Sequence, residues 1–239
     1  MTSGKTPANS TRSVQSYRLI AFDMDSTLIQ CEVVDELARE KGVYSDIAAI
    51  TLSAMQGKID FNESLKQRCE KLAGLTKEAL QRVVDRVQLT PGAEELIQTL
   101  KAYGYKTALI SGGFTFVSEG LKRQLGLDYA FANTLEIENG ALTGKVIPPI
   151  INAQRKAQLL EEIASREKIP LAETIAVGDG ANDLLMLGKA GFSIAFNAKP
   201  AVQAQADAVI NENDLYLITS LLGVEKAAAK PPVSVPPVS

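Results

Sequence analysis

The sequence predicts an α/β protein whose doubly wound, Rossmann-like parallel sheet carries an inserted α-helical cap. Two observations support this fold class. Short, continuous apolar segments alternate with longer amphipathic segments, as they do where helices connect the buried strands of a parallel sheet. The longest interruption of this alternation comes after the first apolar segment, where a long stretch has helical patterns and no convincing strand.

Five segments have the composition of strands that are buried on both faces. Each is a short run of mainly Ile, Val, Leu, Ala and Phe that does not alternate with polar residues, which favours a central position in a parallel sheet. The predicted strands are 17–23, 105–111, 173–179, 191–197 and 206–211.

Helices are predicted between these strands over 92–104, 152–168 and 181–190. Gly104 is a typical stop signal for the first helix, and Asn152 is a candidate N-cap for the second. Strands and helices that follow one another in this order indicate a doubly wound core.

Residues 31–87 are predicted to form the inserted cap, with short helices over 33–42, 45–57, 61–74 and 76–87. A second irregular stretch, 131–149, contains an Asn139-Gly140 pair between apolar residues, which predicts a hairpin or tight turn. We therefore expect a disordered leader over 1–16, a core over 17–30 and 88–223, and a disordered Pro-rich tail over 224–239.

The composition excludes several classes of function. A net charge of -3 and an aromatic content of 5% without Trp give no general attraction for nucleic acid. No apolar run reaches the roughly 18 residues of a membrane-spanning helix. We expect a cytoplasmic protein, a monomer or homodimer, that acts on a small molecule. Because the chain has no His, acid–base chemistry must use carboxylates, Lys, Tyr or Cys.

Carboxylates end two of the predicted strands. Asp23 and Asp25 follow the first strand, and Asp179 and Asp183 follow the strand at 173–179. In open α/β sheets the ligand crevice lies at the carboxyl ends of the strands, so these side chains should meet there. Clustered carboxylates repel one another unless a cation or a proton intervenes, and oxygen ligands suit Mg²⁺. The pattern predicts a magnesium site.

Groups that can hold a phosphate accompany these acids. Ser111 and Gly112 end another strand, where a hydroxyl and open backbone N–H groups can bind an anion. Lys156, near the start of a predicted helix, would neutralise phosphate charge if it faced the crevice. Gly178-Asp179-Gly180 also begins like a dinucleotide-binding GxGxxG turn, but Asp183 replaces the third glycine and would repel a pyrophosphate.

In order, FDMDSTL (22–28), LISGG (109–113), Lys156 and VGDGANDLLML (177–187) resemble the four motifs of the haloacid dehalogenase-like hydrolases. The DST triplet, Glu32 and FNESLKQRCEKLAGL (61–75) are similar to the phosphoserine phosphatase branch. The similarity covers nearly all of residues 18–220. It implies hydrolysis of O-phosphoserine, the last step of serine biosynthesis, or, as an alternative, phosphotransfer to homoserine or hydrolysis of another small phosphomonoester.

The resemblance also implies roles for individual residues. Asp23 would be the nucleophile and Asp25 the general acid and base, with Mg²⁺ held by Asp23, the Asp25 carbonyl and Asp179. The remaining roles are outer-shell support of the metal by Asp183, phosphate binding by Ser111, Gly112, Lys156 and Asn182, and substrate binding by Glu32, Arg68, Met55 and Phe61.

Overall fold

The structure is a computed structural model in which residues 17–224 are described. The predicted leader, 1–16, and all but the first residue of the predicted tail lie outside the described residues. No helix of the described part is long and apolar enough to cross a membrane.

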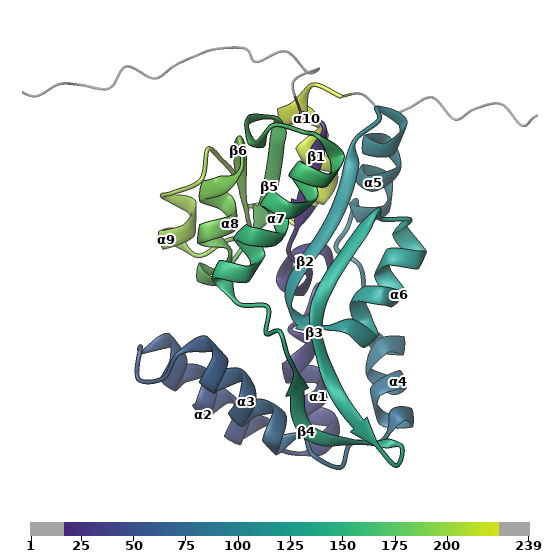
Figure 1. The fold of residues 1–239 in the computed structure, drawn as a ribbon, viewed down its shortest axis with the longest axis vertical. Helices are drawn as coiled ribbons and strands as arrows, with labels where there is room; N and C mark the ends of the chain where they lie inside the picture. Colours follow the sequence, from purple (N-terminus) through teal and green to yellow (C-terminus); the bar gives the residue numbers. More distant parts are fainter. Residues whose placement is uncertain (1–16, 225–239) are drawn as a thin grey trace, which may run out of the picture.

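A seven-stranded sheet forms the centre of the molecule, with the strand order β4-β3-β2-β1-β5-β6-β7 (Figure 1). All neighbouring strands pair in parallel except β3 and β4, which are antiparallel. The mainly parallel, Rossmann-like α/β fold predicted from the sequence is confirmed. The strands are β1 (Leu19–Phe22), β2 (Lys106–Phe114), β3 (Tyr129–Glu138), β4 (Ala141–Ile147), β5 (Thr174–Gly178), β6 (Phe192–Phe196) and β7 (Ala208–Ile210).

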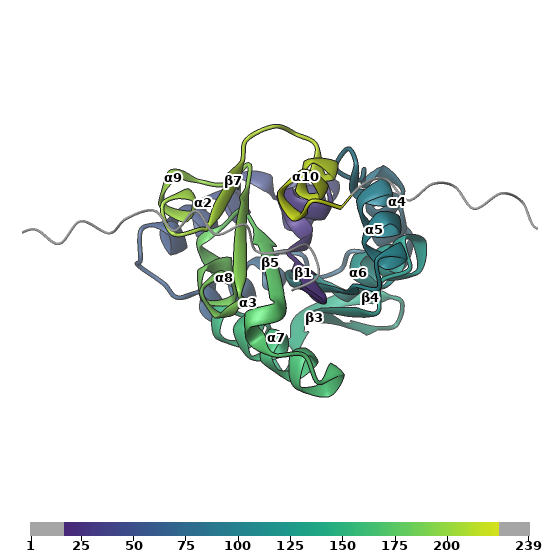
Figure 2. The same ribbon diagram turned by 90° about the horizontal axis from the view of Figure 1, so that it is seen from above.

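Helices cover both faces of the sheet (Figure 2). On β1, Ile20 and Phe22 face one apolar cluster while Leu19 and Ala21 face the other, because side chains alternate along a strand. The first cluster is completed by α5 (Ala93–Ala102), α6 (Thr115–Leu125) and α10 (Ile218–Leu222), and the second by α7 (Ala153–Glu167), α8 (Leu184–Lys189) and α9 (Pro200–Gln203).

The stretch between β1 and β2 folds into helices, as the sequence predicted. They are α1 (Val33–Lys41), α2 (Tyr44–Met55), α3 (Phe61–Lys71) and α4 (Lys77–Arg86), followed in the chain by α5. Asp60 and Thr76 cap α3 and α4, since each side chain accepts a hydrogen bond from a backbone N–H three residues later. In Figure 1, α1–α3 lie beyond one end of the parallel strands.

The predicted turn at Asn139-Gly140 is confirmed. Both residues have positive φ, 50° and 81°, as in the tight turn that joins β3 to β4. The hairpin reaches the inserted helices, where the Gly74 N–H donates to the Leu142 carbonyl at 2.7 Å. The sequence did not indicate the first part of β3, which pairs in parallel with β2 from Ala108 opposite Tyr129.

Candidate active site

The carboxyl ends of β1, β2 and β5 lie side by side and bring distant residues together. Phe22 of β1 is in register with Leu109 of β2 and with Val177 of β5. Asp23 therefore follows β1 where Asp179 follows β5, and the Asp23 N–H donates to the Val177 carbonyl at 2.9 Å. The strand-end carboxylates lie together because the three strands run in the same direction.

Lys156 connects two carboxylates, those of Asp23 and Asp183, on the side that faces the protein interior. Its Nζ lies 2.8 Å from Asp23 Oδ1 and 2.7 Å from Asp183 Oδ1, and all three side chains are at least 95% buried. Burial disfavours the charged amine, but the two carboxylates outweigh it and raise the pKa of Lys156 above its usual value. Lys156 therefore remains a cation in the interior. Asn152, the predicted N-cap, sets the start of its helix by accepting from the Arg155 N–H at 3.0 Å.

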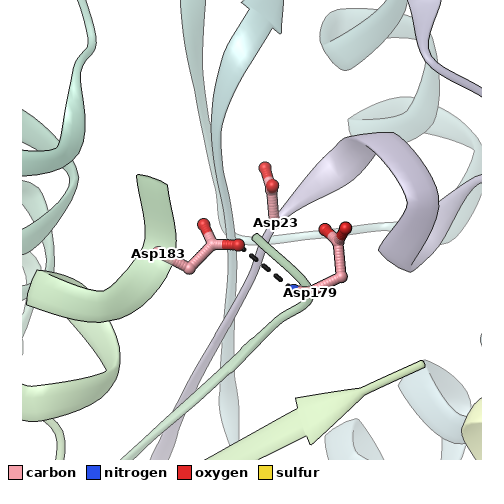
Figure 3. A group of neighbouring side chains, drawn as sticks. All are labelled: Asp23, Asp179 and Asp183. Carbon is pink, nitrogen blue, oxygen red and sulfur yellow. Dashed lines mark hydrogen bonds between the residues drawn. The ribbon is translucent and has the colours of Figure 1, made fainter. Parts of the chain in front are cut away.

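Three carboxylates converge closely enough to hold one cation (Figure 3). Oxygens of Asp23, Asp179 and Asp183 all lie within 4.8 Å of one another. Asp183 is fixed by the backbone, since the N–H groups of Asp179 and Gly180 donate to its Oδ2 at 3.2 and 3.1 Å. A set of only oxygen donors suits a hard divalent cation.

The pKa values of Asp179 and Asp183 indicate that the negative charges of this cluster are not fully compensated. Burial and the neighbouring Asp23 and Asp183 carboxylates raise the pKa of Asp179 to about 8. Burial and Asp23 raise the pKa of Asp183 to about 6, although Lys156 opposes the shift. Lys156 alone does not compensate three carboxylates, so the residues present fit a bound metal ion.

Asp25 lies in an irregular turn, Met24–Leu28, directly after β1. Ser26 has a left-handed φ of 55°, which only a few per cent of non-glycine residues adopt. The Asp25 carboxyl is buried, and its Oδ1 has no hydrogen-bond partner in the described structure. Burial, Glu32 and Asp23 raise the pKa of Asp25 well above its usual range. A raised pKa favours the protonated form of a carboxyl, and that form can donate a proton.

Ser111, Gly112 and Gly113 belong to β2, which extends further than the sequence indicated. The pairing of β2 with β3 shifts register between Ile110 and Phe114, so this segment leaves the regular ladder. Ser111 Oγ accepts from the Gly113 N–H at 2.8 Å. Buried Asn133 on β3 holds the segment in place by donating to the Gly112 carbonyl at 2.8 Å and accepting from the Ile151 N–H at 2.8 Å.

The inserted helices supply the opposite wall of the site. Glu32, just before α1, accepts from the Ser26 hydroxyl at 2.7 Å, and burial raises its pKa. Arg68 on α3 is partly buried, which lowers its pKa, and Glu32 and Asp35 oppose that shift. Phe61 on α3 approaches Gly112, where a Cβ would lie 3.1 Å from its ring.

A cavity of about 900 Å³ separates the strand ends from these helices. It is lined by most of the residues singled out in the sequence, which are Asp23, Asp25, Glu32, Met55, Phe61, Arg68, Ser111, Gly112, Asp179 and Asn182. Lys156 and Asp183 do not line it but lie beneath Asp23.

Sequence reasoning missed several residues of the site. Thr27 donates to Asp179 Oδ1 at 3.4 Å, and Lys199 lines the cavity beside Asp179. Asn133 was missed because its partners lie on other elements and no local pattern marks it. Thr27 could have been noticed, since it belongs to the DST triplet.

Comparison with known proteins agrees with this geometry. The model of the haloacid dehalogenase-like hydrolase family matches residues 17–191. The phosphoserine phosphatase of Archaeoglobus fulgidus is 51% identical over 205 residues, which are 86% of this chain and 60% of that protein. That of Idiomarina loihiensis is 51% identical over 204 residues, or 85% of this chain and 93% of that protein.

Solved structures give the same result. A phospho-aspartyl intermediate analogue of phosphoserine phosphatase is 46% identical, with a TM-score of 0.81 over 86% of this chain and 98% of that one. A substrate-bound phosphoserine phosphatase is 45% identical, also with a TM-score of 0.81. This chain spans about 60% of the Archaeoglobus protein but nearly all of the crystallised chains. The chain belongs to the haloacid dehalogenase-like hydrolase family.

Proposed function

We propose that this protein is a Mg²⁺-dependent phosphatase that hydrolyses O-phosphoserine to serine and phosphate, as in the last step of serine biosynthesis. One observation carries the proposal: two buried carboxyls, Asp23 and Asp25, line one side of a cavity whose other side carries Arg68 and Glu32. The first pair suits phosphoryl transfer, and the second pair matches the two charges of an amino acid.

Asp23 is the proposed nucleophile. One of its oxygens attacks phosphorus, and the bond from phosphorus to the serine oxygen breaks, which leaves an aspartyl-phosphate. The contact of Lys156 Nζ with Asp23 Oδ1, at 2.8 Å, orients the carboxylate for this attack. The solved structure of a phospho-aspartyl intermediate analogue of a relative, described above, supports the assignment.

Asp25 is the proposed general acid and base. Its pKa is raised, which favours a protonated carboxyl. That carboxyl passes its proton to the departing serine oxygen as the ester bond breaks. The resulting carboxylate then accepts a proton from water as the water oxygen attacks phosphorus and releases phosphate from Asp23. Asp25 is thereby returned to its protonated form.

Asp23, Asp179 and the Asp25 carbonyl are the proposed ligands of Mg²⁺, with Asp183 supporting Asp179 through the backbone contacts described above. The cation supplies charge neutralisation, which lets an anionic carboxylate approach an anionic phosphate ester. Ser111, Gly112 and Asn182 line the same cavity, and the Ser111 hydroxyl, the Gly112 N–H and the Asn182 side chain are the proposed partners of the phosphate oxygens.

The inserted helices are proposed to act as a cap, residues 31–87, that recognises the amino-acid part of the substrate. The Arg68 guanidinium would hold the α-carboxylate and Glu32 the α-ammonium. Met55 and Phe61 would form an apolar cover that excludes water.

The two cysteines, Cys31 and Cys69, are both free thiols, which is consistent with the expected cytoplasmic location. A monomer or a homodimer is expected.

The test is phosphate release from O-phospho-L-serine with Mg²⁺, compared with a panel of other phosphomonoesters and with an EDTA control. We expect phosphate release to be strongly selective for O-phosphoserine. EDTA should abolish this release, and the Asp23→Asn variant should show none. Preference for another ester would overturn the substrate and keep the chemistry. Formation of phosphohomoserine when homoserine is added would make the protein a phosphotransferase instead.

A further inference from the structure

One hydroxyl on the cavity wall has no hydrogen-bond partner in the described structure. Phe61, Ser64, Leu65 and Arg68 all line the cavity, and their spacing of three and four residues places them on one face of α3. Ser64 is only 2% exposed, yet its Oγ lacks any partner among the described residues. A buried hydroxyl without a partner costs free energy, so its retention on this face needs an explanation.

The ordinary explanation for a helical serine does not apply to Ser64. Serine hydroxyls inside helices commonly donate to the carbonyl four residues earlier, as Ser53 does to Ala49 at 3.1 Å on the neighbouring α2. The corresponding carbonyl for Ser64, that of Asp60, accepts the Ser64 backbone N–H at 3.0 Å, and the Ser64 hydroxyl donates to no group of residues 17–224. Since Ser64 lines the cavity, its unpartnered hydroxyl is available to a group bound there.

Arg68 lies beside this hydroxyl and is held there by the same residue. Its Nε donates to the Ser64 carbonyl at 3.3 Å, which fixes the guanidinium within one turn of the hydroxyl. The two terminal nitrogens of Arg68 make no hydrogen bond within residues 17–224. A carboxylate bound by those nitrogens would lie against Ser64. Thr51 on α2 adds a second cavity-lining hydroxyl without a partner in the described part.

We propose that the Ser64 hydroxyl donates a hydrogen bond to the α-carboxylate of the substrate, beside Arg68, and that it determines specificity for amino-acid phosphates. The inference rests on the proposed function, which supplies a substrate with a carboxylate. The ammonium is left to Glu32, whose own hydrogen bond from Ser26 orients it toward the same cavity.

Ser64→Ala tests this role with two ligands that differ in the carboxylate. O-phosphoserine carries the carboxylate, whereas O-phosphoethanolamine keeps the ammonium and the phosphate but lacks it. We expect kcat/KM for O-phosphoserine to fall about 10-fold or more, because a hydrogen bond to a charged group is lost. The inhibition constant of O-phosphoethanolamine, measured in competition with O-phosphoserine, should change less than about 2-fold.

Ser118→Ala is the matched control, because Ser118 is a buried helical serine on α6 whose hydroxyl donates to the Thr115 carbonyl at 3.5 Å. It should leave both constants unchanged. Thermal denaturation without ligand is the second readout. Ser64→Ala should keep or raise the Tm, since it removes a polar group that has no partner in the free protein.

The assignment of Ser64 would be overturned if Ser64→Ala weakened both ligands equally or weakened neither. A Tm of Ser64→Ala below that of Ser118→Ala would also overturn it. A wild-type protein that does not prefer O-phosphoserine would overturn the proposed function and this inference together. The wild-type measurement thus separates the two failures.

Discussion

Lys156 Nζ lies 2.8 Å from Asp23 Oδ1 in the buried interior, although the two residues are far apart in the sequence. The same amine lies 2.7 Å from Asp183 Oδ1, so one cation compensates two carboxylates. This contact links the proposed nucleophile to the metal-binding side of the site, and its removal should affect stability as well as activity.

Lys156→Met should lower the free energy of unfolding by about 3–5 kcal/mol, because it leaves buried carboxylates without their cation. Hydrolysis of O-phosphoserine should fall at least about 100-fold. Urea denaturation and steady-state kinetics measure the two effects. Lys189→Met is the control, since its ion pair with Glu161 at 2.6 Å is exposed and should contribute less than about 1 kcal/mol. Equal stability of the two variants would contradict the prediction.

The pKa of Asp179 predicts how stability without metal depends on pH. Its value of about 8 in the folded protein exceeds the usual 3.8, so between these values the folded state binds more protons than the unfolded chain. The metal-free protein should therefore lose stability as the pH rises from about 4 to about 8. Below about pH 4 this penalty is absent, because Asp179 is then protonated in both states.

Bound Mg²⁺ should remove that pH dependence and displace protons. Denaturation from pH 5 to 8.5, with EDTA or with Mg²⁺, should give a falling curve in the first case and a flatter curve in the second. Calorimetry at pH 7 in buffers of different ionisation enthalpy should show release of on the order of one proton per Mg²⁺. Parallel curves and no proton release would exclude Asp179 as a ligand.

Arg68→Ala should lower kcat/KM for O-phosphoserine about 10- to 150-fold, because a charge-assisted contact to the carboxylate is lost. Arg68→Lys should recover little of the loss, since an ammonium lacks the planar fork that binds a carboxylate through two nitrogens. Lys71→Ala, one turn later on α3 and half-exposed in its pair with Asp46, should have no effect on kinetics. A similar loss in Lys71→Ala would indicate a general effect of charge rather than a specific contact.

Asn133→Ala should destabilise the protein by at least about 2 kcal/mol, because it leaves the buried Gly112 carbonyl and Ile151 N–H without partners. It should also weaken product inhibition by inorganic phosphate, since Gly112 loses its support. Asn211→Ala removes an exposed hydrogen bond from Gln203 and should change neither quantity. Denaturation that is unchanged in Asn133→Ala would show that the bridge is dispensable.

The sequence by itself determined most of the elements and the chemistry at the strand ends, although it did not indicate α6, α10 or the first part of β3. Continuous apolar segments predicted the buried strands, and helical periodicity predicted the inserted helices. The Asn139-Gly140 pair predicted the hairpin turn, because both residues tolerate the positive φ that such a turn requires. Asp23, Asp25 and Asp179 could be identified because their positions depend only on where a strand ends. Local pattern and strand direction suffice for such predictions.

Only the tertiary structure decided which groups touch and which remain unpaired. The position of Lys156 beneath Asp23, the bridge made by Asn133 and the isolated hydroxyl of Ser64 each depend on how separate elements pack. The raised pKa values of Asp25 and Asp179 likewise arise from burial and from neighbours distant in the chain, such as Glu32 and Asp183. Such contacts leave no local trace in the sequence, because they are set by register and packing rather than by periodicity.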